Sequence, residues 1–358
     1  MKKILLALAV LASMQVANAQ VKSAADAKKA VEAAEAAASN EKKAIKTATW
    51  IKLGQEYVKA YDAPTGNIIP GSSKTELALM MGSEKPVSTE AVEIQGTPYT
   101  KEVYADKNLY FNANGQLAVI EVTKPVYADA LEKAIAAYQK AYDLDASHAK
   151  SKDIAAAFDL IGQKYNTEAY NKYTLGDLAS ASKYFEKAAE VEALAPLSKI
   201  DTTSIYNAGF TAWATKDMSK AKELFEKCYN LGYYYEGGEV FAKLADVDTL
   251  NTKKYLEEGF EKFPQSQSIL IGLINYYLKS NESTDRLFEL LDKAKANEPN
   301  NASLFYVEGN IRSQLGDTEN AVKAYRKCAE INPEYEYGFI GEGTMYYYRG
   351  SDKGSGRA

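Results

Sequence analysis

Few side chains in this chain of 358 residues could carry out covalent or metal chemistry. His148 is the only histidine, and a single histidine cannot build a histidine-rich metal site. Cys228 and Cys328 have no ligand partner at a suitable spacing, and we interpret both as small core residues. The sequence has no glycine-rich phosphate loop or nucleophile elbow, and its two Asp-x-Asp motifs lack the glycine and distal glutamate of a calcium loop. The sequence therefore predicts no cofactor, no metal and no enzymatic activity, and an enzyme using an acidic pair is the weakest hypothesis.

Aromatic side chains are abundant, and their chemistry suits noncovalent binding. The chain has 27 tyrosines, 11 phenylalanines and 2 tryptophans. Tyr206, Phe210 and Trp213 recur at i, i+4 and i+7, which places them on one strip of a predicted helix. Such rings combine rigid apolar area with a polar tip, so they could anchor a peptide or stack on a sugar ring. The alternative is that neighbouring helices bury them, and the sequence leaves both interpretations open.

The elements that would position these rings are clearest near the C-terminus. We predict one helix over about residues 303–315, a break at Gly316-Asp317, and a second helix that ends before Pro333. Ala321, Tyr325 and Cys328 share one face of this second helix. The marks of the unit follow at intervals of seven, five, four, three and five residues: Gly309, Gly316, Ala321, Tyr325, Cys328 and Pro333. The unit resembles the tetratricopeptide repeat, a helix–turn–helix of 34 residues.

The same intervals recur along most of the chain. Successive copies carry their first-helix mark at Gly54, Ala169, Gly209, Val240, Asn275, Gly309 and Gly343. In the first copy, Trp50-x-x-Leu53-Gly54-x-x-Tyr57 matches the first-helix signature of the family, but its second helix arrives only at Ala134. About 68 residues are therefore inserted into the turn of the first repeat.

These marks set the predicted boundaries of the chain. We expect a covering helix at 20–46, a first repeat at 47–146, repeats two to six at 147–335, and an incomplete seventh repeat or terminal helix and tail at 336–358. The insertion occupies 64–125, where a capping box at Ser73 and later alternating residues predict a short helix and a β-hairpin. Its strands are expected at 99–105, 109–112 and 116–123, with a hairpin turn at 112–115.

The N-terminus carries an independent signal. Residues 1–19 combine two lysines, an apolar run and Ala17-Asn18-Ala19, which is the pattern of a secretory signal peptide cut after Ala19. The apolar run is too short to span a bilayer, and we expect no integral membrane segment once the signal is removed. The protein is therefore predicted to be periplasmic or secreted, of a bacterial type. The mature chain would hold 41 basic and 48 acidic residues, which argues against nucleic acid or anionic lipid as a partner.

The resemblance also implies where a partner would bind. In the tetratricopeptide family the first helices line the concave face of a superhelix. The candidate binding residues lie beside the core stripe on those helices: Tyr170, Tyr173, Tyr206, Phe210, Trp213, Tyr234, Phe241, Tyr276, Tyr306, Asn310 and Tyr347. Asn166, Asn310 and the tyrosine hydroxyls would meet the backbone of a bound peptide.

Together these features predict an all-α fold, a right-handed α-solenoid of about six helix–turn–helix repeats with a small α/β insertion in the first. The resulting function hypothesis is a non-enzymatic scaffold of the bacterial cell envelope that binds a peptide or protein partner in an aromatic concave groove. A carbohydrate- or cell-wall-binding module is the alternative, with sugar rings stacked on Tyr206, Trp213 and Tyr173. For the apolar last helix, a terminal cap and self-association through that helix both stay open.

Overall fold

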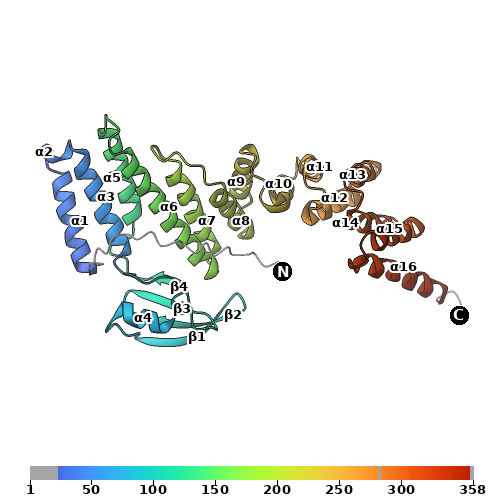
Figure 1. Cartoon of the computed structure of the whole chain (residues 1–358), viewed down its shortest axis with the longest axis horizontal. Coiled ribbons are helices and arrows are strands. Elements are labelled where there is room, and N and C mark those ends of the chain that lie inside the picture. The colour runs from blue at the N-terminus through green and yellow to red at the C-terminus, as the bar shows by residue number, and fades with distance from the viewer. Residues whose placement is uncertain (1–22, 281–283, 355–358) are drawn as a thin grey trace. The chain divides into compact units, whose positions relative to one another are not determined.

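The computed structural model describes residues 23–280 and 284–354. It divides the chain into two compact units, one up to Asp201 and one from Thr202. Both units are built mainly of consecutive helices joined by short turns (Figure 1). The predicted signal peptide, residues 1–19, lies outside the described residues.

The helical part of the first unit consists of paired helices around one core. These helices are α1 (Ala24–Ala38), α2 (Glu41–Ala44), α3 (Thr47–Asp62), α5 (Ala130–Leu144), α6 (Ser151–Thr174) and α7 (Leu178–Glu192). α3 packs against α5, α6 packs against α7, and α1 packs on α3. The close approach of α3 and α5 depends on Gly54, because a Cβ there would lie 2.7 Å from the ring of Tyr138. Ala134 of α5 is fully buried at the same seam.

The insertion between α3 and α5 folds as a short helix and a four-stranded antiparallel sheet with its own small core. Helix α4 (Lys74–Met81) starts at the predicted capping box, in which Ser73 and Glu76 satisfy each other's backbone N–H groups. Strands β1 (Ser88–Ile94), β2 (Thr97–Val103), β3 (Lys107–Phe111) and β4 (Leu117–Val122) pair in sequence order, and Figure 1 shows the sheet beside the ends of the helices of this unit.

The three strands predicted in the insertion correspond to β2, β3 and β4, but β1 was not predicted. Strand β1 is largely exposed and lacks the apolar alternation that marks a half-buried strand. It joins β2 through the two residues Gln95 and Gly96, which have φ angles of 52° and 76°. Two positive φ values are what a type I′ hairpin turn requires, so the Gln-Gly pair was the available signal.

The second unit continues the pattern of helix pairs. Its elements are α8 (Thr202–Ala214), α9 (Met218–Asn230), the short 3₁₀ turn η1 (Glu236–Gly238), α10 (Glu239–Val247), α11 (Thr252–Lys262), α12 (Gln267–Lys279), α13 (Asp285–Asn297), α14 (Ala302–Gln314), α15 (Thr318–Ile331) and α16 (Tyr337–Gly354). The predicted core face of α15 is confirmed, because Ala321, Tyr325 and Cys328 are all buried. Ala221 and Cys228 occupy the equivalent buried positions of α9.

A left-handed residue followed by a capping aspartate closes three of the helix pairs. Gly316 has a φ of 79°, and the carboxylate of Asp317 accepts a hydrogen bond from the backbone N–H of Asn320. Gly176 and Asp177 form the same turn in the first unit. In the turn before α9 the left-handed position is held by Lys216, whose φ is 67°. A side chain costs about 1–2 kcal/mol in this conformation, so the turn is kept there at some strain.

The last helix, α16, packs on α15 through small residues and not through its large aromatic side chains. The register of the repeat would place Phe339 and Tyr346 at core positions, but both side chains are exposed. The face of α16 that meets α15 is instead made by glycines, since a Cβ at Gly341 would lie 2.5 Å from the ring of Tyr325. Small residues make this close contact, while Phe339 and Tyr346 stay exposed, and the hydroxyl of Tyr346 accepts a hydrogen bond from Arg326 of α15.

The predicted fold class is confirmed as a solenoid of helical repeats with a small sheet-containing insertion. Among the described residues, no helix is both long and apolar enough to span a membrane.

Candidate functional site

The strip predicted on α8 is a seam between helices. The ring of Tyr206 is 5% exposed and stacks on Tyr235 with ring centroids 3.9 Å apart. Trp213 donates its indole N–H to the carboxylate of Asp246 at 2.5 Å, and the ammonium of Lys243 lies 3.4 Å from its ring centroid. Tyr206 is therefore a core residue, which corrects its assignment to a binding groove, and Trp213 joins α8 to α10.

Other predicted rings are also used within the fold. Phe241 is fully buried in α10, so it cannot meet a partner while the helix pair is intact, and its assignment is corrected too. Tyr234 stacks on Phe241 with centroids 4.8 Å apart. In the first unit, Tyr170 is partly exposed and packs edge-on against Phe185. The remaining predicted residues are half-buried or exposed: Tyr173, Phe210, Tyr276, Tyr306, Asn310 and Tyr347.

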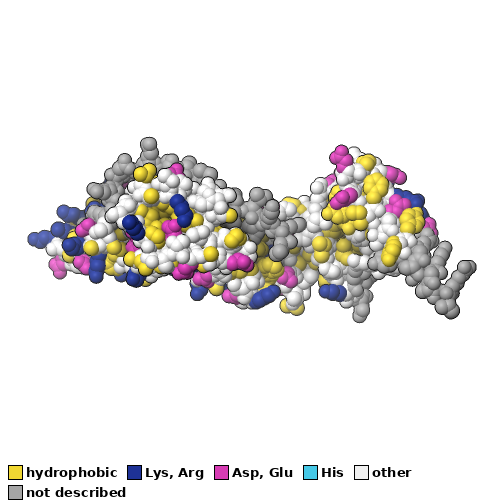
Figure 2. Space-filling model, turned by 90° about the horizontal axis from the view of Figure 1, so that it is seen from below, with side chains coloured by type: hydrophobic (Ala, Val, Ile, Leu, Met, Phe, Trp, Pro, Cys, Tyr) yellow, Lys and Arg dark blue, Asp and Glu magenta, His cyan; other side chains and the backbone are white. Residues whose placement is uncertain are grey.

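Two of the predicted residues, Tyr306 and Asn310, do line a common groove in the second unit. This groove crosses the first helices of successive repeats, α12, α14 and α16, and has a volume of about 410 Å³. Its lining residues are Ile271, Ile274, Asn275, Tyr306, Asn310, Ser313, Gln314, Tyr325, Ile340, Gly341, Thr344 and Met345. None of these side chains carries a charge. Figure 2 shows apolar side chains reaching the surface over the end of this unit, where α14 to α16 lie.

The groove residues form two rows at equivalent positions of the three helices. Ile271, Tyr306 and Ile340 make the first row, in which the two isoleucines are 55% and 54% exposed. Asn275, Asn310 and Thr344 make the second, polar row. Of these six residues, only Tyr306 and Asn310, both on α14, are among the binding residues predicted from the sequence. The others follow from moving 34 or 35 residues along the repeat from Tyr306 and Asn310.

Asn310 is a polar group of this groove that a buried side chain holds in place. Its side-chain oxygen accepts a hydrogen bond of 2.8 Å from the hydroxyl of Tyr325. Tyr325 is buried, and burial together with the neighbouring Tyr306 raises its pKa to about 12, so its hydroxyl stays protonated and donates. Among the described residues the amide NH₂ of Asn310 makes no hydrogen bond, which leaves it available to a backbone carbonyl of a ligand.

The residues with potential for covalent chemistry lie apart from this groove. His148 is exposed in the turn between α5 and α6. Cys228 is fully buried, and burial raises its pKa to about 12, so it remains a thiol and not a nucleophilic thiolate. Burial also raises the pKa of Cys328. Within the residues that the structure describes, no group of three or more His, Cys, Asp or Glu side chains is placed to hold a metal ion.

Comparison with known proteins agrees with the helical repeats. The family model of the tetratricopeptide repeat matches residues 202–233 and 302–335, which contain α8 with α9 and α14 with α15. A TPR repeat-containing protein of Methanocaldococcus jannaschii is 24% identical over 196 residues, covering 49% of this chain and 35% of that protein. The match thus spans about a third of the curated relative.

Solved structures that match this chain superpose on it with low TM-scores. YrrB, described as a TPR protein with an unusual peptide-binding site, gives a TM-score of 0.32 and 19% identity, over 55% of this chain and 96% of YrrB. Yeast Tom70 gives a TM-score of 0.37 and 13% identity, over 90% of this chain and 70% of that chain. The family match is the specific finding: residues 202–233 and 302–335 are similar to the tetratricopeptide repeat.

Proposed function

We propose that this protein is a non-enzymatic interaction module that holds an extended peptide segment of a protein partner in the groove across α12, α14 and α16. The observation that supports the proposal is the pair of rows described above. An exposed apolar row made by Ile271 and Ile340 with Tyr306 runs beside a polar row centred on Asn310. An apolar row can take alternate side chains of an extended peptide, and amide groups can bind its backbone.

The dimensions of the groove fit a short peptide. Packed helices lie about 8–10 Å apart, so three successive first helices span roughly 20 Å. An extended chain rises about 3.3 Å per residue, and the groove would therefore hold about six residues. Because the lining residues carry no charge, the ligand is expected to be recognised by its backbone and apolar side chains and not by an acidic terminus.

The alternative function, carbohydrate binding, has less support from the structure. It requires open ring faces at Tyr206, Trp213 and Tyr173. Tyr206 is buried against Tyr235, and Lys243 lies over the ring of Trp213. Two of the three stacking surfaces are therefore already used within the protein.

Site-specific photocrosslinking tests the peptide proposal. A benzophenone amino acid in place of Ile271 or Ile340 should give a crosslinked protein partner in cells. The same group at Leu250, which is 93% exposed in the turn between α10 and α11, is the matched control. A synthetic peptide covering the crosslinked segment should then bind the purified protein, and Asn310→Ala should weaken that binding about tenfold, the value of one hydrogen bond. Equal labelling from Leu250 and from the groove positions would refute the proposed site.

The proposal includes action outside the cytoplasm, in a bacterial cell envelope, which rests on the sequence pattern of residues 1–19. The N-terminal residue of the exported protein should be Gln20. Recovery of uncleaved protein in the cytoplasm alone would contradict an envelope role.

A further inference from the structure

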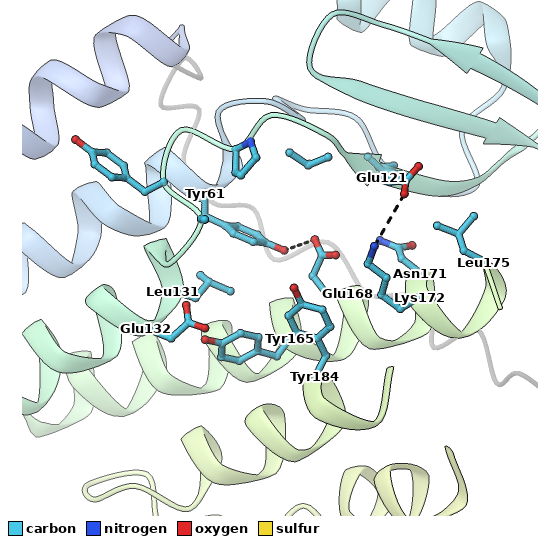
Figure 3. Close-up of a pocket in the computed structure, with 15 residues that line it drawn as sticks. Tyr61, Glu121, Leu131, Glu132, Tyr165, Glu168, Asn171, Lys172, Leu175 and Tyr184 are labelled. Atoms are coloured by element: carbon cyan, nitrogen blue, oxygen red, sulfur yellow. Dashed lines mark hydrogen bonds and ion pairs between the residues drawn. The ribbon is translucent and has the colours of Figure 1, made fainter. Parts of the chain in front are cut away.

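The first unit contains a cavity that exists because the insertion packs beside the repeats. Its volume is about 150 Å³. Strand β4 provides Ile120, Glu121 and Val122, and the other walls come from α3, α5, α6, α7 and the link after β4 (Figure 3). An engineered cavity of this size holds one benzene molecule, whereas pockets for drug-sized ligands measure about 300–1,000 Å³. The cavity is therefore large enough for one side chain and too small for a larger metabolite.

The lining of this cavity is aromatic and acidic. Four tyrosines contribute to it, together with three glutamates and one lysine: Tyr61, Tyr127, Tyr165, Tyr184, Glu121, Glu132, Glu168 and Lys172. Figure 3 shows the rings of Tyr61, Tyr165 and Tyr184 and the carboxylate of Glu168 around one space. Tyrosine rings attract cations, and each of these four rings already has a lysine ammonium near it. Lys164 lies 5.5 Å from the centroid of Tyr61, Lys133 lies 5.3 Å from that of Tyr127, and Lys187 lies 5.5 and 5.7 Å from those of Tyr165 and Tyr184.

The charges of the cavity do not balance. Glu121 lies 4.0 Å from the ammonium of Lys172, and Glu132 forms an ion pair with Lys187. Glu168 accepts a hydrogen bond of 2.7 Å from the hydroxyl of Tyr61, but among the described residues it makes no ion pair. Burial accordingly raises the pKa of Glu168. Three carboxylates thus face two ammonium groups, Lys172 and Lys187, of which Lys172 also acts on Glu168, and one further cation next to Glu168 would balance them.

A buried hydroxyl provides a second, independent sign of an occupant. The side chain of Tyr165 is 2% exposed and lines the cavity, and its hydroxyl has no hydrogen-bond partner. Burial raises its pKa, and the carboxylate of Glu132, which lies beside this hydroxyl in Figure 3, raises it further. A buried hydroxyl that lacks a partner costs about 1–3 kcal/mol, and a ligand N–H would remove this cost.

We propose that this cavity binds the guanidinium group of an arginine side chain presented by a protein partner. A guanidinium is a planar cation with five N–H donors, so it can stack on tyrosine rings while it donates to Glu168 and to the hydroxyl of Tyr165. The carboxylates stand on different walls and do not converge on one point, which suits a planar organic cation better than a metal ion. The inference deepens the proposed function, because it adds a charged anchor in the first unit for the same class of partner.

In this proposal the insertion has a role, which is to form part of the binding cavity. Strand β4 forms one wall, and the turn between β1 and β2 is fixed to α6 by a hydrogen bond of 2.9 Å from the side-chain amide of Gln95 to the carbonyl of Tyr173. The sheet thus adds one wall to the helix surface and makes a partly enclosed site.

Titration of the full chain with blocked amino acids tests the proposal by NMR chemical-shift changes. Nα-acetyl-arginine amide should shift signals of cavity residues, and Nα-acetyl-citrulline amide, its neutral isostere, should not. Glu168→Gln keeps the oxygen that accepts from Tyr61 but removes the charge, and it should weaken arginine binding at least tenfold. Tyr165→Phe should weaken it severalfold while leaving the protein at least as stable. Glu93→Gln, on the exposed strand β1 of the same unit, is the matched control and should change nothing.

Several results would overturn this inference. Equal binding of the citrulline probe, or unchanged binding by Glu168→Gln, would show that charge at the cavity is not recognised. Tighter binding of free arginine than of the blocked form would assign the site to a free amino acid and not to a side chain of a partner. These outcomes are distinct from failure of the groove in the second unit, because crosslinking at Ile340 does not depend on the cavity.

Discussion

Substitution of Gly309 tests how α14 and α15, the helix pair beside the groove, pack against each other. A Cβ at this position of α14 would lie 2.4 Å from Cε1 and 2.5 Å from Cδ1 of Tyr325. The ring is buried and its hydroxyl donates to Asn310, so it cannot swing away without breaking that hydrogen bond. Gly309→Ala therefore forces two packed helices apart at the point where Asn310 is positioned.

The expected magnitude follows from three contributions. Overpacking a buried side chain costs about 1–3 kcal/mol. Loss of the hydrogen bond between Tyr325 and Asn310 costs about 1 kcal/mol. The alanine recovers about 1 kcal/mol of helix propensity. The net expectation is a destabilisation of about 1–3 kcal/mol for α14 and α15.

Gly343→Ala is the matched control, because a Cβ at this exposed position of α16 meets nothing within 4 Å. Alanine should stabilise the helix there by about 0.5–1 kcal/mol. Native-state hydrogen exchange is the appropriate assay, since repeat proteins open locally and a global melt would average over the units. Equal protection of α14 and α15 in the two variants would refute the argument that glycine is needed for this helix contact.

Two further substitutions test burial in the second unit and charge pairing in the first. Tyr206→Ala should destabilise the second unit by about 3–5 kcal/mol in a denaturant titration, as for other large buried rings; a stable variant that loses partner binding would instead restore Tyr206 to the groove. Glu56 is buried against Lys52 and Lys59, at 2.6 and 2.9 Å; burial raises its pKa, but the two lysine hydrogen bonds outweigh this effect and lower it to about 2. Because its pKa in the folded state lies below the ordinary 4.5, the stabilisation is present above pH 4.5 and is lost as the pH falls towards 2. Glu56→Gln should therefore reduce stability at pH 7 and flatten its loss in acid, and an unchanged pH profile in denaturant titrations would contradict this assignment.

The helix pairs could be predicted because their signals are local. The spacing of Gly309, Ala321 and Tyr325 puts small and large residues on facing surfaces of two consecutive helices, and the helix period fixes which side chains share a face. The capping box of Ser73 and Glu76 was equally readable, since both groups lie within one turn. Strand β1 was missed because an exposed strand carries no apolar alternation.

For the candidate site, too, local features could be predicted from the sequence and contacts between distant segments could not. The sequence by itself determined that Tyr306 and Asn310 lie on one face of a first helix, because position within a helix fixes which side chains share a face. Only the tertiary structure decided which rings are covered, since Tyr206 is buried by Tyr235 and Trp213 is covered by Lys243, both from later in the chain. The cavity of the first unit could not be foreseen either, because it requires Glu121 of the insertion and Glu168 of α6 to line one space. Burial and charge balance depend on contacts between distant segments, and the sequence pattern of one helix does not contain them.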